Sequence, residues 1–124
     1  GRTAEGLKTG IAKLKEIRKE FEKDLFIPGD KEGMNVELDK AIRLYDFIIM
    51  GELVAYDALN RNESCGGHFR EEYQTEEGEA KRDDENFFYV ACWEYQGDDE
   101  KAPVLYKEPL VYEAIKVQTR NYKS

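Results

Sequence analysis

The amino-acid sequence predicts a mainly α fold with a small β part: two long antiparallel helices of a helical bundle, followed by a loop and a C-terminal β-hairpin or extended segment. Two long stretches before residue 61 repeat apolar residues every three or four positions, which is the period of an amphipathic helix. The stretch 87–95 is instead aromatic and β-branched, as strands are. The chain has 124 residues, a length that fits one domain. We expect a helical part over about 4–66, a junction and acidic loop over 67–86, and an extended part over 87–120.

The first helix is expected from about Ala4 to Leu25. Its apolar face carries Leu7, Ile11, Leu14, Ile17, Phe21 and Leu25, while lysines and glutamates fill most of the other face. A loop follows, because Pro28 disfavours helix at the residue before it and two glycines stand in the polar run after it. This pattern is typical of a bundle helix and not of a membrane-surface helix.

The second helix is expected from about Val36 to near Asn60, with Asn35 as its N-cap. Its closing turn is expected near Ser64–Gly66, where Gly66 and Gly67 would form the C-cap. Its apolar residues form two stripes. One is Leu38, Ile42, Tyr45, Ile49, Leu53, Tyr56 and Leu59; the other is Leu44, Phe47, Ile48, Val54, Ala55 and Ala58. One partner helix cannot cover both, so we expect exposed apolar surface that self-association or the C-terminal strands would cover. Gly51 is expected to be a close-packing site, not a break.

The rest of the chain is expected to be less regular. Residues 71–82 are mostly charged and predict a mobile loop, whereas 87–95 predicts a strand. Further strand is expected at 104–106 and 110–117, with prolines 103 and 109 confined to ends or edges. Residues 120–124 are expected to form a loose tail.

Composition excludes several classes of function. The net charge is −8 and no Lys/Arg cluster is free of acids, which argues against nucleic acid as a partner. No apolar run reaches the roughly 20 residues of a membrane span, and no secretory signal is present. Cys65 and Cys92 have no CxxC spacing, so reduced cytosolic thiols are expected, with a disulfide left open. The start at Gly1, without methionine, predicts a processed or excised fragment.

Candidate chemical groups concentrate between Arg61 and Asn86, but each one lacks a partner that the chemistry needs. Cys65 and His68 form one close pair of metal ligands, whereas zinc requires four. As a nucleophile pair they lack an orienting third group. The acidic pairs of this stretch lie in its most hydrophilic part and predict a solvated face. We therefore expect no catalytic, cofactor-binding or metal residues. A surface that docks another protein through charged hydrogen bonds is expected instead, and local ion pairs that brace a helix-to-strand junction are the alternative.

The stretch also carries a family pattern. It reads R-x-E-S-x-G-x-H-x-R and then, after an acidic spacer, R-D-D-E-N and an aromatic residue. The matching positions are Arg61, Glu63, Ser64, Gly66, His68 and Arg70, then Arg82, Asp83, Asp84, Glu85, Asn86 and Phe87. This pattern resembles the C-terminal region of the flavoprotein subunit of succinate dehydrogenase and fumarate reductase. Related flavoproteins such as L-aspartate oxidase share the first half of the pattern, so the R-D-D-E-N half is what favours the succinate dehydrogenase and fumarate reductase family. The departures are Cys65 for the usual arginine, Gly67 for alanine, and no proline near Tyr73–Gln74.

The resemblance implies a support domain without an active site. FAD, its covalent histidine link and the substrate-binding residues of the family lie in the flavin-binding and capping domains, whose motifs this chain lacks. The chain would supply two helices of a small bundle that packs on the flavin domain. The inter-domain interface implied is Arg61, Glu63, Ser64, Gly66, His68, Arg70, Arg82, Asp83, Asp84 and Asn86.

The parent enzyme implied by the resemblance interconverts succinate and fumarate and couples this reaction to a quinone. It works with an iron-sulfur subunit and a membrane anchor on the inner face of the cytoplasmic membrane. A free-standing acidic helical adaptor is the alternative. A dinucleotide-binding glycine motif upstream in the reading frame would favour the flavoprotein.

Overall fold

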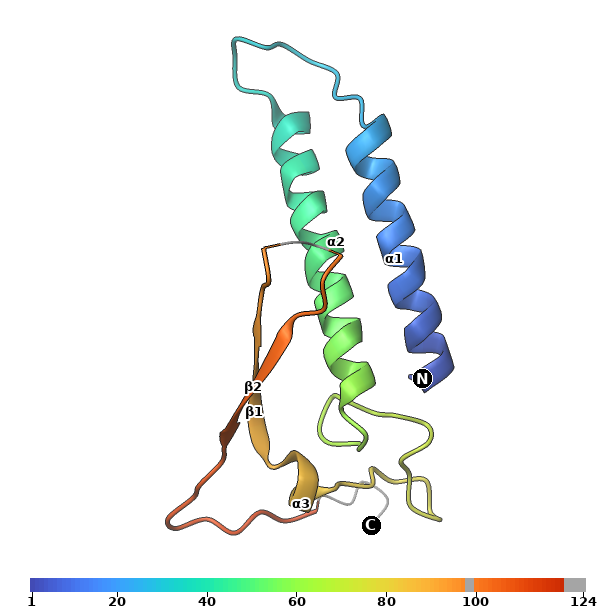
Figure 1. Ribbon diagram of the computed structural model, residues 1–124, viewed down its shortest axis with the longest axis vertical. Coiled ribbons are helices and arrows are strands. Elements are labelled where there is room, and N and C mark those ends of the chain that lie inside the picture. The colour runs from blue at the N-terminus through green and yellow to red at the C-terminus, as the bar shows by residue number, and fades with distance from the viewer. Residues whose placement is uncertain (98–99, 120–124) are drawn as a thin grey trace.

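The computed structural model describes residues 1–97 and 100–119. Two long helices lie side by side and antiparallel, and a β-hairpin runs along the C-terminal half of the second helix (Figure 1). The elements are α1 (Ala4–Asp24), α2 (Val36–Asn60), the short α3 (Asp84–Phe87), β1 (Tyr89–Glu94) and β2 (Val104–Pro109). This architecture confirms the predicted fold class, with its two helices and C-terminal hairpin.

Side chains next to the helices fix where each one begins. The Thr3 hydroxyl accepts a hydrogen bond from the backbone N–H of Gly6 at 3.0 Å, which caps α1. The predicted Asn35 cap of α2 is confirmed: its side-chain oxygen accepts from the N–H groups of Glu37 and Leu38 at 3.0 and 3.1 Å. The amide of Asn35 also donates to the carbonyl of Pro28 at 3.3 Å, so the cap ties the interhelical loop to α2.

The predicted glycine cap at the end of α2 is wrong. The helix ends at Asn60, and Arg61 is the C-cap residue, with its N–H donating to the Asp57 carbonyl at 3.1 Å. Gly66 does adopt a positive φ of 58°, but in a later tight turn where Cys65 and His68 exchange two backbone hydrogen bonds. The glycines therefore serve the loop after the helix, and the carbonyls at the helix end find other donors.

The two helices share a thin interface. Ile48 and Ala58, both on α2, are the only buried apolar side chains among residues 1–97 and 100–119. Phe21 and Tyr45 stack with ring centres 5.7 Å apart, and the buried Arg18 donates to Glu52 at 3.1 Å across the helix pair. No helix in the described part of the chain is both long enough and apolar enough to cross a membrane.

Much of the apolar surface of α2 stays exposed, as its two stripes predict. Phe47 is 70% exposed, and the exposed set on this helix also includes Val36, Leu38, Ile42, Leu44, Met50 and Val54. A single partner helix covers only part of the circumference of α2, so the rest is available to another surface.

The hairpin pairs Tyr89 with Pro109 at one end and Glu94 with Val104 at the other. It contacts α2 through Trp93, whose indole N–H donates to Asp57 at 2.8 Å and whose ring meets that of Tyr56 edge-on. The inward side chains of β1 therefore hold the hairpin on the C-terminal half of the helix.

Three strand boundaries differ from the prediction. The first strand starts at Tyr89 and not at Phe87, because the Asp83 carboxylate accepts from the Asn86 N–H and caps the turn of α3. The second extends beyond residue 106 to Pro109. The expected strand 110–117 does not form: after the bond from Leu110 N–H to the Phe88 carbonyl, β1 offers no further partner. The tail expected at 120–124 lies outside the described residues.

The charged loop 71–82 contains a hydrogen-bonded turn. The N–H of Thr75 donates to the carbonyl of Glu79 at 2.9 Å, and Gln74 and Ala80 form a bridge. The Lys81 N–H donates back to the Tyr73 carbonyl at 3.2 Å. The loop is thus folded on itself beside the helix ends, and its predicted mobility stays a prediction.

Gly51 gives a test of the helix interface. A Cβ added there would meet the nearest atom of Leu14 at 3.8 Å, an ordinary contact. Gly51→Ala is therefore expected to stabilise the protein by about 0.5–1 kcal/mol, since glycine is unfavourable inside a helix. The same change at Gly66, with φ of 58°, is expected to destabilise it by about 1–2 kcal/mol. Chemical denaturation measures both. A destabilising Gly51→Ala would mean that the helices pack more closely than described.

Candidate functional site

The stretch Arg61–Asn86, called the junction below, joins α2 to α3 and β1 at one end of the helix pair (Figure 1). Arg61 is its first residue. One guanidinium nitrogen donates to Glu63 at 2.8 Å and to the Phe87 carbonyl at 3.0 Å, and the other donates to the Tyr89 carbonyl at 3.1 Å. The guanidinium also lies over the Phe87 and Tyr89 rings. Arg61 thus connects the end of α2 to the start of the hairpin.

Glu63 is buried, with a relative exposure of 2%. One carboxylate oxygen accepts from Arg61 and the other from the backbone N–H of Asp83 at 3.0 Å. Ser64 beside it is fully buried, and its hydroxyl exchanges two hydrogen bonds with the backbone of Arg70. Both oxygens of the buried carboxylate therefore accept a hydrogen bond, which offsets part of the cost of its desolvation.

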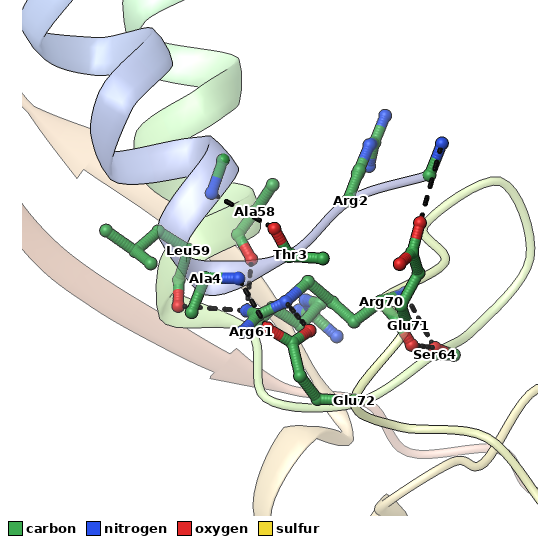
Figure 2. Close-up of polar contacts among 12 residues, drawn as sticks. Arg2, Thr3, Ala4, Ala58, Leu59, Arg61, Ser64, Arg70, Glu71 and Glu72 are labelled. Carbon is green, nitrogen blue, oxygen red and sulfur yellow. Dashed lines mark hydrogen bonds and ion pairs between the residues drawn. The ribbon is translucent and has the colours of Figure 1, made fainter.

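Arg70 supplies the cap that the glycines do not. Its side chain is 2% exposed, and it donates to the carbonyls of Ala58 and Leu59 at 3.1 and 3.3 Å (Figure 2). These carbonyls belong to the last turn of α2, where a helix has unpaired acceptors and a partial negative charge. The guanidinium donates to these acceptors and places a positive charge beside the negative end of the helix, and its Nε donates to Glu72 at 3.1 Å.

Glu72 carries the connection to the start of α1. One oxygen accepts from Arg70, and the other accepts from the backbone N–H of Ala4, the first residue of that helix (Figure 2). The hydrogen bond from Ala4, followed by the one from Arg70, lowers the pKa of Glu72 from 4.5 to about 2. Arg70 and Glu72 therefore join the C-terminus of α2 to the N-terminus of α1.

His68 is held by both ring nitrogens. Nε2 lies 3.0 Å from the Arg61 carbonyl and must donate to it, because a carbonyl only accepts. Nδ1 lies 3.1 Å from Nη1 of Arg2 and accepts from that guanidinium. With neither nitrogen free as a base, the histidine cannot activate Cys65 in this arrangement. The ring serves as a bridge between the segment before α1 and the end of α2.

The second half of the motif is more exposed. Arg82 donates to Asp84 at 2.6 and 2.9 Å and to the carbonyl of Gln118 at 3.3 Å. The hydrogen bond to Asp84 raises the pKa of Arg82. Asp83 accepts from both the backbone and the side-chain amide of Asn86. These contacts shape the turn of α3 and leave Asp84 and Asn86 at the surface.

The structure thus brings part of the predicted site into one polar cluster with the contacts of an internal brace: Arg61, Glu63, Ser64, His68 and Arg70, with the backbone of Asp83. Gly66, Asp84 and Asn86 stay exposed, and Arg82 bonds to Asp84 and Gln118. Sequence reasoning missed Arg2 and Glu72, which tie α1 to the cluster. The three acceptors of the Arg61 side chain, Glu63 and the carbonyls of Phe87 and Tyr89, also have no signal in the sequence. Whether the ten residues face another domain stays a prediction.

Groups for metal or redox chemistry do not gather in the described part of the chain. Among residues 1–97 and 100–119, no three His, Cys, Asp or Glu side chains lie close enough to hold a metal ion. Cys65 is half-buried and Cys92 is exposed, and both are free thiols.

The fold and the junction define a helix-pair domain with a polar brace at one end and a small hairpin on one side. A family model described as the C-terminal region of the fumarate reductase flavoprotein matches residues 1–122. The chain therefore belongs to this family, which is part of the succinate dehydrogenase and fumarate reductase flavoproteins.

One solved structure supports the same assignment. The chain is similar to FrdA, in a mutant form, of the Escherichia coli quinol fumarate reductase, with a TM-score of 0.74. The two are 27% identical, and the match covers 93% of this chain. It covers only 18% of that protein, so this chain spans less than a fifth of its length.

Arg70→Lys tests the cap on α2. Lysine keeps the charge but cannot reach two carbonyls and a carboxylate with a planar fork. We expect a loss of about 2–4 kcal/mol in the free energy of unfolding, because buried acceptors would be left unpaired. Lys81→Arg, the reverse exchange at an exposed residue of the junction, is the control and is expected to be neutral. Equal stability of the Arg70 variant and the wild type would contradict the cap.

Acid denaturation tests Glu72. Its pKa is lower in the folded state, so its stabilising effect is complete above the unfolded value of 4.5 and is lost as the pH falls toward 2. Glu72→Gln is expected to flatten the stability profile in that window. Glu76→Gln, in the same loop, serves as the comparison. Unchanged acid sensitivity in the Glu72 variant would mean that its two hydrogen bonds do not hold in solution.

Proposed function

We propose that this chain is the C-terminal helical support domain of an FAD-dependent succinate dehydrogenase or fumarate reductase flavoprotein subunit. The match over residues 1–122 carries this proposal, because it includes both halves of the junction motif. The parent reaction is the interconversion of succinate and fumarate, coupled to a quinone. The domain packs on the flavin-binding and capping domains and carries no active site itself.

The surface of α2 supports a packing role. Its exposed apolar residues Leu44, Phe47 and Met50 follow each other at steps of three and therefore lie side by side on the helix surface. Monomeric proteins rarely leave a large apolar face uncovered. We propose that further helix of the parent bundle covers it, and that the fragment alone self-associates through it.

The junction supports the inter-domain role in a different way. Its internal bonds fix the backbone, while Gly66, Asp84 and Asn86 stay at the surface. A rigid polar edge of this kind suits docking, since little side-chain entropy is lost on binding. We propose that the ten motif residues listed from the sequence lie at or directly behind the contact with the flavin domain.

The parent complex defines the remaining partners. We propose an iron-sulfur subunit and a membrane anchor beside the flavoprotein, with the whole complex on the inner face of the cytoplasmic membrane. The alternative of a free-standing adaptor has no comparable observation in its favour, since the family match points to the flavoprotein.

Flavin content gives the first test. The product of the complete reading frame is expected to purify with flavin and to interconvert succinate and fumarate. Residues 1–124 produced alone, with helix content checked by circular dichroism, are expected to carry neither flavin nor activity. A yellow fragment with a flavin spectrum would overturn the proposal.

Phe47→Gln tests the docking face. This side chain is 70% exposed here, so its loss should leave the helix pair intact, whereas in the parent subunit it should remove about 2 kcal/mol of buried contact. We expect the full subunit to melt earlier and to lose flavin faster. Asp46→Gln, the neighbouring exposed residue, is the matched control. Normal melting and flavin retention in the Phe47 variant would show that another surface docks.

A further inference from the structure

The β1 strand has an unpaired edge. The bond from Leu110 N–H to the Phe88 carbonyl, with the register of the hairpin, assigns the even-numbered residues of β1 to hydrogen bonding with β2. The backbone groups of Tyr89, Ala91 and Trp93 therefore point to the other side. There the Tyr89 carbonyl accepts from Arg61, while Ala91 and Trp93 have no backbone partner on that edge in the described structure.

This edge borders a groove. The groove has a volume of about 540 Å³, and its walls are β1 on one side and a stripe of α2 on the other. Leu53, Val54 and Ala58 line the helical wall, and Val54 is 53% exposed. An unpaired strand edge beside an apolar helical wall has the two features that bind an extended peptide: backbone donors and acceptors for pairing, and surface for alternate side chains.

One end of the groove is positively charged. Arg2 and Arg61 lie there, although the chain as a whole carries a net charge of −8. The donors of Arg61 are directed at Glu63 and two carbonyls, whereas Arg2 is bonded through a single nitrogen, to His68. Nε and Nη2 of Arg2 have no acceptor among the described residues, so this end suits a carboxylate. Asp57, the acid that lines the groove, already accepts from Trp93 at the other end.

We propose that this groove binds an extended acidic segment of a separate partner polypeptide. The segment adds to β1 as a third strand by pairing with Ala91 and Trp93. Its apolar residues lie on Val54 and Leu53, and an Asp or Glu at its end pairs with Arg2. Because Arg61 already occupies the Tyr89 carbonyl, pairing stops there and the added strand is short. This inference does not depend on the parent reaction proposed above.

The test measures amide hydrogen exchange in the product of the complete reading frame, with and without a defined probe. The probe is the peptide acetyl-Thr-Val-Thr-Val-Thr-Glu-amide at roughly 1 mM. We expect slower amide exchange at Ala91 and Trp93 and unchanged exchange at Leu105 and Lys107 on the opposite edge of the hairpin. A probe that ends in lysine should bind about tenfold more weakly, since repulsion from Arg2 replaces a charge-assisted pair.

Two variants separate edge pairing from general binding. Ala91→Pro removes one donor from the free edge and no bond from the β1–β2 ladder, so it should abolish the protection of Trp93 while the hairpin persists. Lys107→Pro makes the equivalent change on the opposite edge and should leave probe binding intact. Three results would each overturn the proposal. The amides of Ala91 and Trp93 could exchange at the same rate with and without the probe, they could be slowed equally by the lysine probe, or they could already exchange slowly before any probe is added.

Discussion

The ion pair between Arg61 and Glu63 is the constraint on which the other contacts depend. The carboxylate is almost fully buried, and a buried charge is tolerated only when its partners satisfy it. Arg61 supplies one bond and the backbone of Asp83 supplies the other. The same guanidinium reaches two carbonyls at the start of the hairpin. The end of α2, the turn of α3 and the first residues of β1 therefore have one relative position in which every partner is satisfied.

At this end of the molecule a polar cluster, not an apolar core, thus fixes the relative positions of the elements. Arg70 and Glu72 join the last turn of α2 to the first turn of α1, and His68 adds a link to Arg2. Apolar burial is slight in contrast: in the described structure only two apolar side chains, Ile48 and Ala58, are buried. This combination, a rigid braced end and a thinly covered helix pair, fits a domain that is stabilised further by packing on a larger protein.

The features that depend on local sequence could be predicted. The apolar period predicted the bounds of α1 to within a residue and the start of α2 at Val36, where Asn35 marked the N-cap. The closing turn of α2, expected near Ser64–Gly66, lies earlier, at Asn60. The features that depend on distant contacts could not. Gly66-Gly67 looks like a helix cap, but the sequence cannot show that the side chain of Arg70 reaches back to Ala58 and Leu59. The contact of Arg2 with His68 spans 66 positions and leaves no local signal. Asp83, the N-cap of α3, is of a residue type that favours N-caps, but the aromatic residues after it predicted a strand from residue 87.

A double-mutant cycle between Arg61 and Glu63 tests the central role of this ion pair most directly. Arg61→Gln, Glu63→Gln and the double variant are compared by urea denaturation of the complete polypeptide. A buried pair that braces the junction predicts a coupling free energy of about 1–3 kcal/mol. The exposed Arg43–Asp39 pair on α2 is the control, expected at about 0.3–0.5 kcal/mol. A coupling between Arg61 and Glu63 no larger than the control would contradict the role assigned to the pair and, with it, the view that the junction is an internal brace.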